Sequence, residues 1–223
     1  MTEYLLSFDP SLRAYGNHDA SAAIFRNGSL EFAVEEGRLI RDKRAGEFPA
    51  QSIRACLDAC DIEFSQVDRI VIPWVPELKI KTVPHRLKRD LRTSSGLGRV
   101  TSIAGTLKNA FDWRFRADEI LESRLRKEFG GPLPTIESAQ HHACHAASAF
   151  HPSPFDSALG LTLDGKGEYD STVVWECTPD GIERIKTYPF PNSLGRFYGG
   201  VTKYLGYHWR NGAGKVMGSS VFS

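Results

Sequence analysis

Two histidines in one short segment are spaced to hold a metal ion. In QHHACHAASAF, residues 140–150, His141 and His145 stand four positions apart, which places them on one face of a helix, one turn from each other. Two such imidazoles can bind one cation. The pair alone is a weak signal, because helical histidines are common and a zinc protease would carry Glu where His142 stands. A metal site therefore needs a further ligand.

Asp164, in LTLDGKGE, is the candidate for that ligand. The apolar run predicts a strand that delivers the aspartate to a Gly-rich turn, a position where functional sites are often built. Two imidazoles and a carboxylate leave coordination positions open, and they suit Fe(II), Mn(II) or Zn(II) acting as a Lewis acid. The alternative is that Asp164 only caps the turn at Gly165. His142 points off the metal face and is interpreted as lying behind the ligands or on the surface.

The elements that must position these side chains can be predicted from the hydrophobic pattern. Apolar runs bounded by turn residues predict strands, and Asn27-Gly28 is a strong hairpin signal. Apolar spacing typical of helices marks residues 49–60, 141–150 and 193–207. The predicted strands are residues 4–8, 21–25, 30–34, 69–74, 135–138, 157–163, 171–177 and 182–188. Blocks of strands followed by helices predict an α/β fold, a mixed sheet with flanking helices.

Residues 77–130 differ in character, being basic and helix-leaning, and are interpreted as a helical insertion. Clustered cations can bind phosphates of a nucleic acid. The run lacks the regular aromatic interleaving of a single-strand binder, so a solvated helix face is the favoured interpretation. The run comprises Lys79, Lys81, His85, Arg86, Lys88, Arg89, Arg92 and Arg99.

The composition bounds the class of protein. Lys and Arg number 28 and Asp and Glu 27 in 223 residues, a formal charge of +1, so no global field attracts nucleic acid or an anionic membrane. No stretch reaches the roughly 20 apolar residues of a membrane span, and the N-terminus does not resemble a signal peptide. The four cysteines form no CxxC pair and are expected to be reduced. We expect a cytoplasmic protein without nucleic-acid or membrane partners.

Three segments resemble a known family. GNHDASAAIFRNGSLEFAVEEGRLIRDK, HHACHAASAFHPSPFDSALGLTLDGKGE and SLGRFYGGVTKYLGY with GKVMG are similar, in this order, to the N-terminal domain of the carbamoyltransferases. This family includes nodulation-factor and antibiotic O-carbamoyltransferases. The resemblance implies an actin-like ATPase fold, related to hexokinase and ribonuclease H, over residues 1–223 with residues 77–130 inserted.

The resemblance also implies roles for single residues. His141, His145 and Asp164 would bind the divalent metal, for which we expect Fe(II), with Zn(II) and Mn(II) as alternatives. His18, in HDASAA, would be the general base for the acceptor hydroxyl, since imidazole has an ordinary pKa of about 6.5. Lys43 would face the nucleotide or the carbamoyl group. GKVMG is not a phosphate-binding P-loop, and its glycines Gly214 and Gly218, with Gly212, are interpreted as turns.

The implied reaction is O-carbamoylation. Carbamoyl phosphate and ATP would give a carbamoyl adenylate, whose carbamoyl group passes to a hydroxyl of a sugar or other small molecule. The chain stops at GSSVFS, where the family continues, so we expect a fold incomplete at the C-terminus. A second polypeptide supplying the missing half, with a fourth metal ligand and phosphate contacts, is an expected partner, and a homodimer is a further expectation.

Two rival interpretations come from other classes. A truncated chain could be an inactive fragment or a binding module, which predicts no turnover and an exposed apolar cleft face. An enzyme of the tRNA threonylcarbamoylation type is the other rival. Competition by RNA would distinguish it from a small-molecule carbamoyltransferase.

Overall fold

A computed structural model describes residues 2–12, 15, 20–42, 46–208 and 212–222. The chain divides into two compact units, Met1–His141 and His142–Ser223. The boundary between the units falls after the first residue of helix α6 (His141–Phe150). The rest of this helix belongs to the second unit. The predicted base His18 and the predicted nucleotide-facing Lys43 lie outside the described residues.

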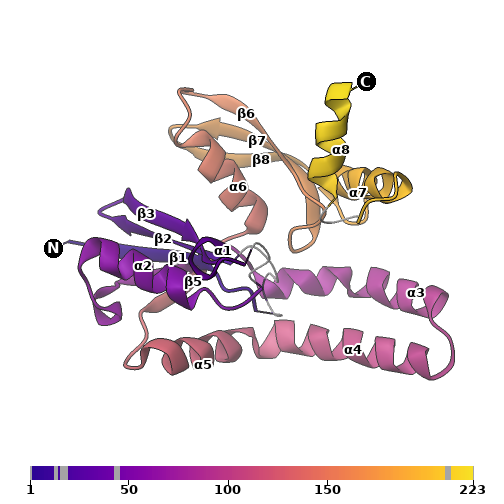
Figure 1. Ribbon diagram of the computed structural model, residues 1–223, viewed down its shortest axis with the longest axis horizontal. Helices are drawn as coiled ribbons and strands as arrows, with labels where there is room; N and C mark the ends of the chain where they lie inside the picture. The colour runs from indigo at the N-terminus through magenta and orange to yellow at the C-terminus, as the bar shows by residue number, and fades with distance from the viewer. Residues whose placement is uncertain (1, 13–14, 16–19, 43–45, 209–211, 223) are drawn as a thin grey trace. The chain divides into compact units, whose positions relative to one another are not determined.

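The first unit is built on a mixed five-stranded sheet (Figure 1). The strand order is β3-β2-β1-β4-β5, with β1, β2 and β3 antiparallel and β4 and β5 parallel to β1. The bounds are β1 Tyr4–Asp9, β2 Ser21–Arg26, β3 Ser29–Glu35, β4 Arg69–Ile72 and β5 Thr135–Ser138. The predicted α/β class with a mixed sheet is confirmed.

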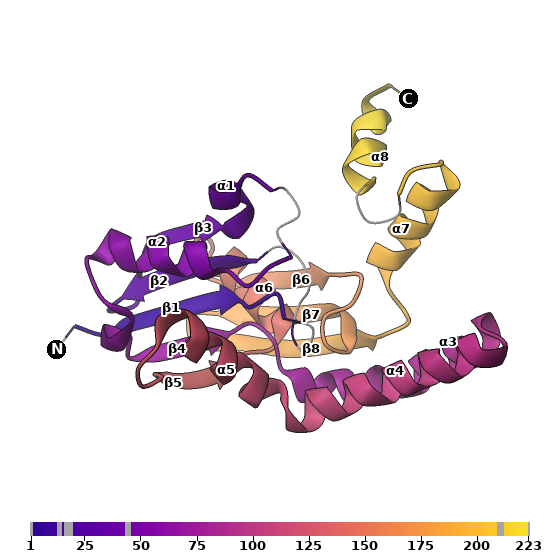
Figure 2. The same ribbon diagram turned by 60° about the horizontal axis from the view of Figure 1, so that its bottom comes forward.

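One face of this sheet carries the core of the unit. Alternate residues of a strand point to opposite faces, and Leu6, Ile24 and Ile70 are fully buried on one of them. They form one cluster with side chains of two helices, α2 (Ala50–Cys60) and α5 (Ala117–Phe129). Figure 2 shows α2 lying along the sheet. Burying this apolar surface is the main stabilising term for the unit.

A short helix missed by the sequence prediction, α1 (Glu36–Ile40), places a buried carboxylate at the start of α2. Glu36 is 3% exposed and accepts hydrogen bonds from the amides of Gln51 and Ser52 at 3.1 and 2.7 Å, and from the Ser52 hydroxyl at 2.7 Å. The first amides of a helix lack partners within it. Glu36 therefore caps α2, which has no capping side chain at Pro49.

Glu36→Ala is expected to lower the free energy of unfolding by about 1–3 kcal/mol, because buried donors lose their acceptor. Glu35→Ala is the control: Glu35 pairs with Arg38 at 3.2 Å on the surface, and such pairs contribute about 0–1 kcal/mol. Urea unfolding of both variants measures the difference. Equal losses would contradict the capping role.

The stretch from Pro76 to Phe129 is almost entirely helical. It comprises the 3₁₀ helix η2 (Pro76–Thr82), α3 (Val83–Thr93), α4 (Gly96–Phe115) and α5. In Figure 1, α3 and α4 run side by side as a long helical hairpin. The Thr106 hydroxyl of α4 donates to the buried Asp90 carboxylate of α3 at 2.7 Å, and this hydrogen bond, with Arg89, lowers the pKa of Asp90.

The prediction that the basic run forms a solvated helix face is wrong for one of its residues. Lys79 is buried, donates to the backbone carbonyl of Tyr15 and lies 4.5 Å from the ring centre of Trp74. A buried ammonium needs such partners, because desolvation otherwise disfavours its charge. Arg89, Lys88 and Arg92 are exposed, as a solvated face requires.

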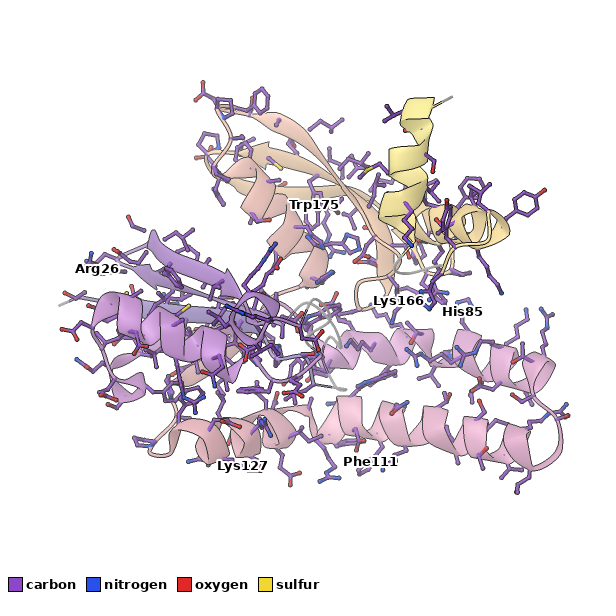
Figure 3. The ribbon with its side chains drawn as sticks, in the orientation of Figure 1. Arg26, His85, Phe111, Lys127, Lys166 and Trp175 are labelled. Carbon is purple, nitrogen blue, oxygen red and sulfur yellow. The ribbon has the colours of Figure 1, made fainter. Side chains whose placement is uncertain are left out.

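The second unit is an antiparallel meander, β6-β7-β8, with α6 against it. The strands are β6 Ala158–Leu163, β7 Asp170–Thr178 and β8 Gly181–Pro189. Val173, Trp175 and Cys177 of β7 form its core with Ala146 of α6. Figure 3 marks Trp175 between the helix and the strands. The small alanine side chains of α6 allow the helix to lie close to the sheet.

Two further α-helices, α7 (Leu194–Tyr204) and α8 (Ala213–Ser219), and the 3₁₀ helix η3 (Ser220–Phe222) complete the described chain. Gly214 and Gly218 lie inside α8, so the interpretation of these glycines as turns is wrong. Ala213, Lys215 and Met217 are good helix formers and outweigh the two glycines. Among the described residues, none of the helices combines the length and apolar character that a bilayer span requires.

Candidate metal centre

Helix α6 positions the two histidines. Alanine at positions 143, 146 and 147 favours the helix, and Ala146 is buried against the core of the second sheet. The helix ends at Phe150, ahead of Pro152 and Pro154, which cannot continue it. His141 and His145 therefore lie one turn apart at its N-terminal end. The predicted helix over residues 141–150 is confirmed at both ends.

Asp164 follows the last residue of β6. Its amide donates to the carbonyl of Ser171 at 2.9 Å, and its Oδ1 accepts the amide hydrogen of Gly165 at 2.6 Å. The carboxylate thus caps its own turn, as the alternative interpretation held. A carboxylate has two oxygens and about four acceptor positions, so capping the turn and binding a metal are compatible.

The structure brings His141, His145 and Asp164 together. One ligand atom from each lies within 4.8 Å of the other two, with His141 and Asp164 partly buried and His145 exposed. Ligand atoms of a Zn²⁺ ion lie about 2.0–2.2 Å from it, so donors of one ion stand about 3–4 Å apart. Two nitrogens and one oxygen with a side open to solvent are a donor set that fits a catalytic divalent ion. Binding itself remains a prediction.

The start of α7 holds the backbone of the Asp164 turn. The Ser193 hydroxyl caps α7 by accepting from the Arg196 amide at 3.0 Å, and it donates to the Asp164 carbonyl at 2.7 Å. The Arg196 side chain donates to the Gly165 carbonyl at 3.3 Å. Sequence reasoning missed this contact. Serine ahead of a helical pattern predicts a cap, but the turn on which it acts is distant in sequence.

Cys144 stands between the two histidines in the sequence but is not one of the converging donors. Burial, with a smaller contribution from Glu168, raises the pKa of its thiol to about 11. Among the described residues, the donors that converge here are the histidine pair and the aspartate.

His145 also lines an open groove of about 450 Å³ beside α6 and β6. The other lining residues are mainly apolar, among them Phe150, Leu159 and Leu161. The groove opens the His145 side of the cluster to a ligand from solvent.

The sequence leaves two interpretations of His142, behind the ligands or on the surface, and the structure excludes the second, because only 1% of this residue is exposed. Its ring nitrogens contact Thr162 and the carbonyl of Asp170. A core with polar groups in reach of both nitrogens accounts for a buried histidine.

Fold and cluster together define an α/β protein with a candidate centre of two histidines and one aspartate. Comparison with known proteins then identifies the family. The model of the carbamoyltransferase N-terminus matches residues 12–221. The chain belongs to the carbamoyltransferase family.

Individual relatives agree. The chain is 32% identical over 192 residues to nodulation protein NolNO of Sinorhizobium fredii, covering 85% of this chain and 26% of that protein. It is 33% identical over 210 residues to the uncharacterized protein sll1178 of Synechocystis, covering 90% and 32%. The chain thus spans about a third or less of the length of these relatives. Among solved structures, YeaZ from Pseudomonas aeruginosa is similar with a TM-score of 0.38 and 14% identity, over 85% of this chain and 68% of that one.

Proposed function

We propose that this chain contributes the metal-binding part of an O-carbamoyltransferase. The observation that carries the proposal is the convergence of His141, His145 and Asp164 in a member of the carbamoyltransferase family. These residues would hold the divalent metal, Fe(II) with Zn(II) and Mn(II) as alternatives. When bound, such an ion supplies Lewis-acid polarisation of an acyl or phosphate oxygen.

The proposed fold is actin-like, with residues 1–223 as the N-terminal part of the domain and residues 77–130 inserted. The mixed sheet of the first unit, an antiparallel meander extended by parallel strands, supports this assignment. In the second unit, another antiparallel meander, β6-β7-β8, comes after α6 and is followed by helix α7. The proposed location is the cytoplasm.

In the proposed reaction the carbamoyl group comes from carbamoyl phosphate, which water hydrolyses to carbamate and phosphate. The carbamate attacks the α-phosphorus of ATP and displaces pyrophosphate. The hydroxyl of a sugar or other small molecule then attacks the carbamoyl carbon, and AMP leaves. His18 would take the hydroxyl proton as general base, and Lys43 would face the nucleotide or carbamoyl group.

A polypeptide that supplies further ligands and phosphate contacts is the proposed partner, and a homodimer is a second proposed association.

Incubation with carbamoyl phosphate, ATP and a panel of sugars tests the proposal. We expect pyrophosphate to be released only when carbamoyl phosphate is present. We also expect the mass of an acceptor to increase by that of one carbamoyl group. The assay is run on the chain alone and after addition of the C-terminal region of a longer relative. Absence of carbamoyl transfer in both arms would support the binding-module alternative, and inhibition by transfer RNA would favour the threonylcarbamoylation type.

A further inference from the structure

His142 is the buried neighbour of the two candidate metal ligands. Both of its ring nitrogens have partners: Nδ1 lies 2.8 Å from Oγ1 of Thr162, and Nε2 lies 3.0 Å from the backbone carbonyl of Asp170. All three residues belong to the second unit. A buried polar side chain of this kind is fixed in orientation by its hydrogen bonds.

The partners determine which nitrogen donates. A carbonyl oxygen can only accept, so Nε2 carries the hydrogen that it shares with Asp170. Nδ1 lies within hydrogen-bond distance of the Thr162 hydroxyl, whose oxygen also lies 3.4 Å from the backbone carbonyl of Val173, to which it can donate. The indole Nε1 of Trp175 donates to the same hydroxyl oxygen at 3.0 Å. The imidazole thus belongs to a network in which each of these polar groups has a partner.

Both partners lie beside Asp164. Thr162 lies in β6, two positions before Asp164. The Asp170 carbonyl closes the other end of the turn, where it also accepts the Gly167 amide at 2.9 Å. The His142 side chain of α6 therefore contacts residues on both sides of the Asp164 turn.

We infer that His142 is a positioning residue, which sets the distance between the histidine pair on α6 and the carboxylate of Asp164. This inference rests on the proposed metal site. It adds a residue that fixes the relative positions of the ligands. Residues behind metal ligands typically change metal affinity about 10–100-fold when they are replaced.

Three substitutions in the full chain separate this role from general stability. His142→Leu fills the space without either hydrogen bond. His142→Gln carries a terminal NH₂ that can reach the Asp170 carbonyl in place of Nε2. His151→Leu is the matched control, because His151 is exposed and follows the end of α6. Zn²⁺ affinity is measured by competition with a chromophoric chelator, Co²⁺ binding by its visible absorption, and melting of the metal-free variants by circular dichroism.

The expected result is an approximately 10–100-fold weaker Zn²⁺ affinity and an altered Co²⁺ spectrum for His142→Leu. His142→Gln should recover most of the affinity, and His151→Leu should match the wild type. If His142→Leu does not fold, His142→Asn replaces it, since Asn can reach Thr162 but not the Asp170 carbonyl, and the same loss is expected.

Wild-type affinity in a folded His142→Leu or His142→Asn variant would overturn the positioning role and leave the metal site intact. So would a variant that melts earlier yet binds Zn²⁺ as the wild type does. A wild-type chain that binds neither Zn²⁺ nor Co²⁺ would overturn the metal site itself, and the positioning role with it. The two failures are therefore distinguished by the wild-type measurement.

Discussion

The double variant His141→Ala/His145→Ala should contain no bound divalent metal under purification conditions in which the wild type retains it near stoichiometry. Two of the three converging donors are removed, and the remaining Asp164 carboxylate already accepts the Gly165 amide. A single carboxylate on a surface turn does not hold a transition metal that prefers imidazole nitrogen. Elemental analysis for iron, zinc and manganese measures the difference and also identifies the metal.

A second readout makes the same test independent of metal retained during purification. A ligand that binds only the folded state stabilises it, by about 2.7 kcal/mol when its concentration is 100 times its dissociation constant. Added metal should therefore raise the melting temperature of the wild type and leave that of the double variant unchanged.

The control for both readouts is His85→Ala/His151→Ala, which removes the same number of imidazoles outside the cluster. This variant should retain metal and respond to added metal as the wild type does. Equal metal content in the wild type and in the His141→Ala/His145→Ala variant would contradict the assignment of the site.

Much of the candidate site could be predicted because its signals are local. The interval between His141 and His145 is one helical turn, and Asp164 ends an apolar strand, so both patterns can be read within a dozen residues. That these two elements meet could not be derived from spacing, because the pairing depends on how α6 packs on the sheet. The family resemblance supplied this step, and the structure places the ligand atoms within 4.8 Å.

The features that could not be predicted depend on contacts between distant positions. Glu36 and Lys79 are charged residues for which a sequence pattern favours exposure, yet each is buried with partners far along the chain. The burial of His142 likewise depends on Thr162 and Asp170, 20 and 28 positions away. In each case tertiary hydrogen bonds offset the cost of desolvation that a local pattern cannot take into account.

Gly195→Ala is expected to destabilise the packing of α7. A Cβ atom at this position would lie 2.7 Å from the amide nitrogen of Gly165 and 2.8 Å from the carbonyl carbon of Asp164. Both are backbone atoms, which cannot rotate away as the end of a side chain can. Either the helix or the Asp164 turn must therefore move, and such overpacking typically costs about 1–3 kcal/mol.

The displacement should also reach the candidate metal site. The Ser193 hydroxyl donates to the Asp164 carbonyl at 2.7 Å, so moving the start of α7 disturbs the residue that carries the carboxylate ligand. We expect Gly195→Ala to weaken Zn²⁺ binding, in addition to lowering the free energy of unfolding in urea.

Gly200→Ala provides the matched control within the same helix. A Cβ atom at Gly200 would have no atom within 4 Å, and alanine is favoured over glycine in a helix by about 0.5–1 kcal/mol. Gly200→Ala should therefore unfold at the same or a higher urea concentration than the wild type, with unchanged Zn²⁺ affinity. Identical behaviour of the two alanine variants would contradict the close approach of α7 to the Asp164 turn, because glycine would then be required at neither position.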